Sequence, residues 1–451
     1  MECRRTVSLD DKETGENMAK LKIRRLGAVR DYELDVKHVN VLIGEQATGK
    51  STICKIIYFF RMVKNEITEY LFRVSTSGRA ADGEKFPKAL NAVTKDIFVQ
   101  LFGYSWELPD DLYAEYFFTD EIFISVYISI VHGKRYLEVR FSDELIKKVK
   151  GLERSAFEFY GKQTDDLSFS YISSERVRLH NDLQWQINAF FQDELETYYI
   201  PAGRSMLTLM THQKTKLDYT ALDLANRKFM QFIESIQPKF DRGISMVHNY
   251  YVKSERRFST DTMIKELKEN LKGEYFYNDG QEYFMVSDHY KIPINFISSG
   301  QQEVLWLLNQ LYVLLLREER AFVIIEEPEA HLYPKLQKRV IDFIVRFANL
   351  TGSTVLITTH SPYILSCINT LCYAGKLAED ETKREQVAKI VGKHTLIKPG
   401  EIYAGKLLCE SGQTNVQNLV MEEEQELYTE LIDEVSDMNN ELYTRLYELE
   451  V

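Results

Sequence analysis

The sequence predicts an α/β fold in which a mainly parallel sheet carries an antiparallel β-lobe and a mainly helical insertion. Three apolar or β-branched segments, each followed by glycine-rich or polar residues, predict parallel strands at residues 39–43, 322–327 and 354–359. Residues 21–25 and 32–36 alternate in polarity around a turn and predict an antiparallel pair. Because ligands bind at the carboxyl ends of parallel strands, the residues that follow the three strands are candidates for a functional site.

A phosphate-binding loop follows the first parallel strand. It has the G-x-x-x-x-G-K-S pattern of a P-loop, or Walker A motif, and reads Gly44-Glu45-Gln46-Ala47-Thr48-Gly49-Lys50-Ser51-Thr52. Backbone N–H groups would wrap a phosphate, Lys50 would reach the β- and γ-phosphates, and the Ser51 hydroxyl would bind Mg²⁺. The alternative is a glycine turn that happens to precede Lys-Ser. The strand before the loop and the apolar helix predicted over residues 53–63 favour binding of a nucleoside triphosphate.

The other two parallel strands end in candidate catalytic residues. Glu326 would hold Mg²⁺ directly or through water, and Glu327 would orient and polarise the attacking water. His360 would form a hydrogen bond with a γ-phosphate oxygen. The alternatives are a surface turn for the two acids and a structural role for the histidine. The presence of Lys50 and Ser51 in the same chain favours the catalytic roles.

A second anion site is predicted before the apolar helix at residues 304–316. The residues that precede this helix are Ser298, Ser299, Gly300 and Gln301. The serines can cap the helix, which leaves free N–H groups and the positive end of the helix dipole pointing outward. The alternative is a helix cap with no ligand.

Charge is distributed unevenly along the chain. The formal net charge is −12, but residues 421–451 hold eleven acidic residues against one basic residue. An acidic total therefore does not exclude a basic face on the main body. Apolar residues in 422–451 recur at steps of three and four and predict an acidic amphipathic helix; they are Leu427, Leu431, Val435, Met438, Leu442, Leu446 and Leu449. That helix would dock on its own domain or, as the alternative, on a partner.

The composition favours a cytoplasmic protein. No apolar run reaches the roughly 18 residues that a membrane span needs, and the first residues do not form a signal peptide. The five cysteines are scattered without a C-x-x-C pair, which is typical of reduced thiols. The nine histidines lack the spacing of metal ligands, so no zinc site is expected.

The long middle region mixes strands and helices. In order, we expect a hairpin at residues 121–142, helices at 182–197 and 217–236, a strand at 198–203 that leads to an exposed Arg204, and a hairpin at 273–286. The helix after the first hairpin carries four basic residues: Lys147, Lys148, Lys150 and Arg154. A solvated face explains such a cluster, and nucleic-acid contact is the alternative.

These elements predict five segments. They are a flexible leader at residues 1–17, the first part of the ATPase core at 18–63, the β-lobe and helical insertion at 64–290, the second part of the core at 291–420, and the acidic helix at 421–451. Met18 precedes the first patterned strand, so translation starting there is a further hypothesis.

Together, the motifs resemble the ABC-type ATPase superfamily, within it the SMC/RecF/OLD branch. The P-loop, the signature at Ser298, the two-glutamate strand and the His360 loop occur in the family's order. The run Glu327-Pro328-Glu329-Ala330-His331-Leu332-Tyr333-Pro334 is similar to the E-P-E-x-H-L-x-P run of OLD-type ATPases, and residues 199–205 also resemble those proteins. Two positions depart from the pattern: Glu326 replaces the usual Asp, and Ser299 replaces the usual Gly. Gln100 is only a weak candidate for the family's Mg²⁺-sensing glutamine.

The resemblance implies ATP and Mg²⁺ as ligands and a head-to-tail dimer. Each ATP would lie between Lys50 of one chain and Ser298 of the other, with slow, switch-like hydrolysis catalysed by Glu327 and His360. Neither a TOPRIM nuclease domain nor long coiled-coil arms are visible in the sequence. The remaining architecture resembles stand-alone ATPase subunits of bacterial anti-phage systems, such as AriA of PARIS and PtuA of Septu.

Three functional hypotheses follow from that resemblance. The first is an ATP-gated scaffold and sensor in phage defence that controls a separate effector, such as a nuclease subunit. The alternative is a DNA-binding ATPase of RecF or SMC type in repair or recombination, for which the basic cluster near Lys147 would supply the DNA face. A transporter subunit is disfavoured because a long insertion separates Lys50 from Ser298 and nothing indicates a membrane partner.

Overall fold

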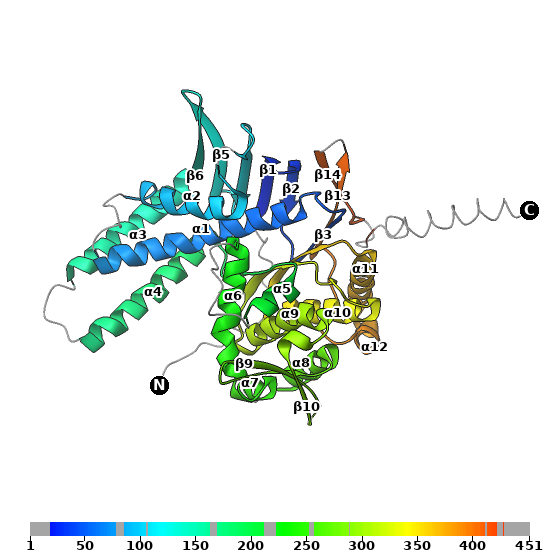
Figure 1. Cartoon of the computed structure of the whole chain (residues 1–451). Coiled ribbons are helices and arrows are strands. Elements are labelled where there is room, and N and C mark those ends of the chain that lie inside the picture. The colour runs from blue at the N-terminus through cyan, green and yellow to red at the C-terminus, as the bar shows by residue number, and fades with distance from the viewer. Residues whose placement is uncertain are drawn as a thin grey trace, which may run out of the picture.

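The computed structural model describes residues 19–77, 85–104, 107–162, 169–211, 222–251, 257–287, 289–410, 413–421 and 427. Within these residues an eleven-stranded mixed sheet forms the centre of the molecule, with strand order β6-β5-β4-β1-β2-β14-β13-β3-β12-β11-β7. A separate three-stranded sheet has the order β10-β9-β8. Figure 1 shows β1, β2, β5 and β6 on one side of the long helix α1, and most of the remaining helices together with β9 and β10 on the other. The predicted α/β fold with a β-lobe and a helical insertion is confirmed.

The parallel half of the sheet contains the strands predicted from their apolar runs. Its members are β7 (Glu196–Ile200), β11 (Ala321–Glu326), β12 (Thr354–Thr359), β3 (Val39–Gly44) and β13 (Ile402–Glu410). The register pairs Thr359 with Ile43 and Thr358 with Glu326. The carboxyl ends of β3, β12 and β11 therefore lie side by side.

The antiparallel β-lobe continues the same sheet. It consists of β1 (Lys20–Leu26), β2 (Val29–Asp35), β4 (Tyr113–Phe117), β5 (Phe123–Val131) and β6 (Lys134–Phe141). Strand β14 (Gln413–Asn418) joins the lobe to the parallel half, because it pairs antiparallel with β13 and parallel with β2. The two predicted strand pairs around residues 21–36 and 121–142 are confirmed.

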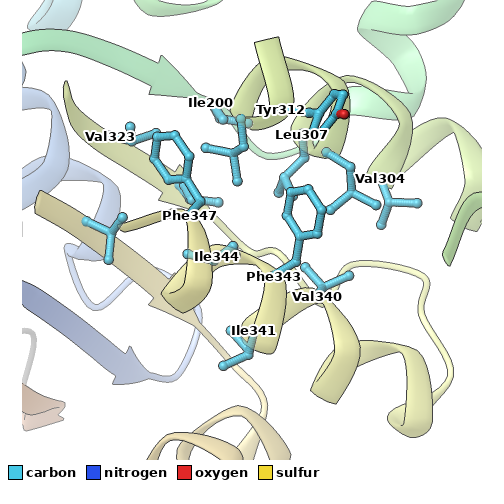
Figure 2. Packing of buried hydrophobic residues seen from close by; sticks show 14 of the residues in the cluster. Ile200, Val304, Leu307, Tyr312, Val323, Val340, Ile341, Phe343, Ile344 and Phe347 are labelled. Atoms are coloured by element: carbon cyan, nitrogen blue, oxygen red, sulfur yellow. The ribbon is translucent and has the colours of Figure 1, made fainter. Parts of the chain in front are cut away.

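Helices cover both faces of the parallel strands because the strand residues alternate between two cores. Val323 and Ile325 of β11 belong to the core under α9 and α10, whereas Phe322 and Ile324 belong to the core under α1. Figure 2 shows part of the first core, in which side chains of α9, α10, β7 and β11 converge. Burial on both faces explains why these strands are continuous apolar runs in the sequence.

Four helices pack against one another beside the β-lobe: α1 (Lys50–Ser77), α2 (Lys88–Phe102), α3 (Asp143–Lys162) and α4 (Phe169–Phe191). The remaining helices are α5 (Arg204–Thr211), α6 (Leu224–Ile236), α7 (Ile244–Tyr251), α8 (Arg257–Leu271), α9 (Ser299–Leu316), α10 (Pro334–Thr351), α11 (Pro362–Leu377) and α12 (Glu381–Val391). Short 3₁₀ turns occupy Gln237–Phe240 and Ile294–Phe296. The small sheet consists of β8 (Glu274–Asn278), β9 (Gln281–Ser287) and β10 (Tyr290–Pro293).

Several predicted boundaries were wrong. The helix predicted at residues 182–197 ends at Phe191, and Gln192 has a positive φ of 49°. Residues 196–200 instead pair with β11 as strand β7, so tertiary pairing overrides the helical pattern. Of the helix predicted at 217–236, residues 217–221 lie outside the described residues. The observed helix begins at Leu224, and the side chain of Asp223 caps it by accepting a hydrogen bond from Asn226 N.

Two predictions fall largely outside the described residues: the leader at 1–17 and the acidic helix at 421–451. Within the second segment, Leu427 is buried, and its N–H donates to Asn369 Oδ1 of α11 at 2.8 Å. The five-segment division of the chain stays a prediction. No helix of the described residues is long and apolar enough to cross a membrane.

Candidate functional site

The P-loop connects β3 to α1 as its sequence predicts. Lys50 Nζ donates hydrogen bonds to the carbonyl oxygens of Gly44 at 2.8 Å and Glu45 at 2.7 Å, so the side chain folds back over the loop. Ala47 and Gly49 have positive φ values of 61° and 95°. These values curve the backbone around the lysine, in the conformation that lets successive N–H groups point inward.

The ends of the three neighbouring strands bring the predicted residues together. His360 Nδ1 lies 3.5 Å from Lys50 Nζ, and His360 Nε2 lies 3.3 Å from Glu327 Oε1. The imidazole therefore stands between the lysine and the carboxylate. Glu327 has a positive φ of 43°, a sparsely populated conformation for a glutamate. The backbone turn at the end of β11 directs this side chain towards His360.

Glu326 supplies a buried oxygen of the kind that binds Mg²⁺. The residue is only 6% exposed, and its Oε2 accepts a hydrogen bond from Ala202 N at 3.3 Å. Its Oε1 is buried and accepts no hydrogen bond of ordinary geometry from the described residues, although the Tyr199 hydroxyl lies close to this carboxylate. A buried anionic oxygen needs a compensating cation, and carboxylate and hydroxyl oxygens suit Mg²⁺. Glu326 therefore has the chemistry of a Mg²⁺ ligand, and Ser51, exposed at the start of α1, carries the hydroxyl predicted to join it.

Burial and nearby carboxylates act in opposite directions on Lys50. Burial lowers the pKa of its ammonium group, whereas the negative charges of Glu327, Glu329 and Glu326 raise it. Lys50 and the buried Arg204 lie among these three carboxylates and that of Glu303, so this end of the sheet carries excess negative charge. A Mg²⁺ ion would balance this charge.

The signature segment forms the predicted helix cap. Ser298 Oγ accepts a hydrogen bond from Gln301 N at 3.3 Å, and Gln301 Oε1 accepts one from Ser298 N at 3.2 Å. This reciprocal capping box begins α9. Gln301 Nε2 also donates to Leu271 O at 2.9 Å, so the Gln301 side chain forms its hydrogen bonds within the protein. Ser299 remains exposed at the first turn, and its role as an anion ligand stays a prediction.

Glycine is required at the next position of the signature. A Cβ atom on Gly300 would lie 2.9 Å from the carbonyl oxygen of His331, which is too close for an ordinary contact. The loop after β11 and the start of α9 therefore touch through backbone atoms. The sequence pattern alone gave no sign of this contact.

Two site residues were missed by the sequence analysis. Glu329 Oε1 accepts hydrogen bonds from Thr359 Oγ1 and from His360 N, both at 2.7 Å, and so anchors the histidine loop. Arg204 was predicted to be exposed, which is wrong because it is fully buried behind Glu326 and Glu327. Both residues lie in segments that resemble OLD-type ATPases, and that resemblance was the signal available for them.

Two weaker candidates do not join this site. The amide of Gln100 on α2 is hydrogen-bonded to Asp96 and to Arg227 of α6, so nothing supports it as a metal sensor. On α3, Lys147 pairs with Glu144 at 3.3 Å, as expected of a solvated face. Lys148 lies over the ring of Phe190 at 5.4 Å. Nucleic-acid contact by this helix stays an alternative.

A family model matches residues 39–366, which is well over half of the chain, and is described as "AAA domain, putative AbiEii toxin, Type IV TA system". The chain belongs to this AAA domain family. The matched range begins at β3 and ends in α11, so it contains the P-loop, the signature, both strand-end glutamates and His360. No curated protein matches the chain.

Solved structures similar to this AAA domain protein include three SMC heads. An SMC head bound to the C-winged helix domain of ScpA is 12% identical with a TM-score of 0.39, covering 90% of this chain and 98% of that chain. The SMC head domain from Thermotoga maritima is 9% identical with a TM-score of 0.37, covering 90% and 100%. The head from Pyrococcus furiosus, with an extended coiled coil and bound to the C-terminal domain of ScpA, is 14% identical with a TM-score of 0.36, covering 89% and 96%. At such scores these likenesses carry no argument about function.

Proposed function

We propose that this AAA domain protein binds ATP with Mg²⁺ and hydrolyses it to ADP and phosphate. The observation that carries the proposal is the contact series from Lys50 through His360 to Glu327 at the ends of three adjacent strands. A phosphate-binding lysine, a hydrogen-bonding histidine and a carboxylate next to one phosphate site are the components of phosphoryl transfer to water.

In the proposed reaction, Glu327 accepts a proton from the water that attacks the γ-phosphorus. The bond from phosphorus to the β–γ bridging oxygen then breaks, and ADP leaves. Lys50 neutralises charge on the β- and γ-phosphates, and His360 holds a γ-phosphate oxygen through a hydrogen bond. Ser51 and Glu326 would hold Mg²⁺, which would supply positive charge that neutralises the phosphates.

A head-to-tail dimer is the second part of the proposal. Large aromatic side chains stand exposed near the predicted signature and catalytic segments: Phe296 is 73% exposed, Tyr333 78% and Tyr363 57%. Phe296 lies two residues before Ser298, and Tyr363 lies three residues after His360. Aromatic side chains are enriched in protein interfaces. A second copy would cover them and bring its own signature to the ATP bound at Lys50.

We propose further that this ATPase is a gated scaffold and sensor of a defence complex that controls a separate effector protein. The support for this role is the family description, which reads "putative AbiEii toxin, Type IV TA system". ATP would stabilise the closed dimer because it binds that state preferentially. The alternative is a DNA-binding ATPase, with Lys147, Lys150 and Arg154 on one exposed side of α3.

Two substitutions test the ATPase. Lys50→Ala should lower ATP affinity by about 100-fold, because it removes a charge-assisted phosphate contact. Glu327→Gln should bind ATP normally and lower kcat by about 100-fold, because the proton acceptor is lost. Glu401→Gln is the matched control, since Glu401 precedes β13 at the amino ends of the parallel strands, away from the site at their carboxyl ends. Phosphate release at the wild-type rate by Glu327→Gln would remove that residue from the proposed role.

Affinity purification of Glu327→Gln with ATP present tests the biological role. A stoichiometric second protein with little nucleic-acid absorbance supports the gated effector. Bound DNA without a partner protein supports the repair ATPase instead.

A further inference from the structure

Arg204 is a buried arginine at the start of α5 that contacts both the helix of the signature and the strand of the catalytic glutamates. The side chain is 0% exposed. Its Nε donates to the carbonyl oxygen of Glu303 at 2.8 Å and lies 3.4 Å from Glu303 Oε2. Glu303 is itself 1% exposed and lies on α9, five residues after Ser298. One side of the guanidinium group is therefore fixed to the signature helix.

The other side of the guanidinium group holds the end of β11. Nη1 donates to the carbonyl oxygens of Glu326 at 2.6 Å and Pro201 at 2.8 Å, and Nη2 donates to that of Glu327 at 2.8 Å. These bonds fix the two peptide units that carry the catalytic carboxylates. They also support the unfavourable positive φ of Glu327. The orientation of Glu327 thus depends on where Arg204 lies.

The carboxylate of Glu303 completes the connection to α5. Its Oε2 accepts a hydrogen bond from Arg204 N at 3.1 Å, and its Oε1 accepts one from Ser205 N at 3.0 Å. Thr208 Oγ1 adds a neutral link at 3.3 Å to the carbonyl oxygen of Gln302. Figure 1 shows α5 beside α9. A displacement of α9 must therefore move Arg204 with it or leave a buried charge without its partner, and the second outcome is strongly unfavourable.

We propose that Arg204 is a positioning residue that couples the two ATP sites of the dimer. The inference rests on the proposed ATPase and head-to-tail dimer. In that dimer the signature of one chain contacts ATP held by its partner. When this contact displaces α9, Glu303 moves with it and shifts the guanidinium group of Arg204. The guanidinium group in turn shifts the backbone of Glu326 and Glu327, which act on the chain's own ATP. The ATP bound to one chain would thereby set the hydrolytic competence of the other.

Arg204→Lys tests the coupling because it keeps the positive charge near Glu303 but lacks the rigid fork of five N–H donors. We expect ATP affinity within about two-fold of wild type, since Arg204 does not touch the P-loop, and kcat lower by about tenfold. The Hill coefficient for ATP in hydrolysis should fall from above 1 in the wild type to 1. The matched control is Thr208→Val, which removes the neutral link between α5 and α9 and leaves the guanidinium contacts intact. It should keep the wild-type Hill coefficient.

The measurements are ATP binding by fluorescence titration, steady-state phosphate release, and thermal unfolding of each full-length variant. A kcat and a Hill coefficient unchanged in Arg204→Lys would overturn the proposal, as would a wild-type Hill coefficient of 1. Parallel losses of ATP affinity and thermal stability would show a purely structural role and would also overturn it. A wild type that binds ATP but releases no phosphate defeats the proposed ATPase. The coupling is then measured as cooperativity of ATP binding, and equal cooperativity in wild type and Arg204→Lys overturns it.

Discussion

Lys64 should give the protein a contribution to stability that grows as the pH rises above 8. The residue lies on α1, is 2% exposed, and contacts the main-chain carbonyl of Asp193. Its ammonium group is 3.5 Å from Asp193 Oδ2, a carboxylate that also pairs with Arg61. Burial lowers the pKa of Lys64 from 10.5 to about 8, and the charge of Asp193 only partly opposes this effect.

The sign and size of the effect follow from proton linkage. Below pH 8 the folded and unfolded chains both hold the proton, and the full penalty of burying the charge applies. Between about pH 8 and pH 10.5 the folded chain releases the proton first, so the unfolded chain binds more protons and the free energy of unfolding rises with pH. From pH 8 to pH 9.5 this rise amounts to about 1–2 kcal/mol for Lys64 alone.

Urea unfolding of wild type and Lys64→Met between pH 7 and pH 9.5 measures the effect. Because methionine does not titrate, the free energy of unfolding of the wild type should rise by about 1–2 kcal/mol relative to that of the variant from pH 8 to pH 9.5. Lys147→Met is the control, because the Lys147 side chain is 79% exposed. The difference in free energy of unfolding between this variant and wild type should stay constant over the same pH range. A constant difference between wild type and Lys64→Met would refute the reasoning.

Two further predictions concern packing and the histidine loop. Gly375→Ala should lower the free energy of unfolding by about 3 kcal/mol, because the new Cβ would lie 1.8 Å from the carbonyl oxygen of Ile397. A Cβ on Gly151, which lies on helix α3, would meet no atom within 4 Å, so Gly151→Ala should raise the free energy of unfolding by about 0.5–1 kcal/mol. Urea unfolding checks both variants, and similar midpoints for the two would contradict the packing argument. Glu329→Ala should lower kcat about tenfold with ATP affinity retained, because it releases His360 N. Phosphate release and nucleotide titration check this, and a wild-type kcat would exclude Glu329 from anchoring the loop.

Local signals in the sequence were sufficient for the elements that depend on neighbouring residues. The P-loop has its predicted strand and helix because Gly49 tolerates the positive φ that the turn requires. Ser298 and Gln301 form the predicted cap, since both partners lie within one helical turn. The hairpin at residues 273–286 turns where predicted, and Asp279 and Gly280 there have the positive φ values of 49° and 77° that such a turn requires.

Distant contacts explain what the sequence analysis got wrong. Arg204 was predicted to be exposed because a lone arginine in a loop usually is, but its partners Glu303 and Glu326 lie 99 and 122 positions away. Strand β7 was taken partly for helix because its pairing partner, β11, is equally remote in sequence. No local pattern records such contacts, since helical and strand periodicity reflects only neighbours within a few residues.

The sequence by itself therefore determined which residues have the chemistry to bind a phosphate, hold a metal or accept a proton, and their roles stay predictions. Only the tertiary structure decided which of them act together. The strand order places β12 between β3 and β11, although β11 precedes β12 in the chain and β3 lies far before both. That order puts His360 between Lys50 and Glu327. The pairing of β7 with β11 brings Arg204, which follows β7, to the end of β11. The physical reason is that strands pair to bury their apolar faces on both sides, and this burial joins segments that are remote along the chain.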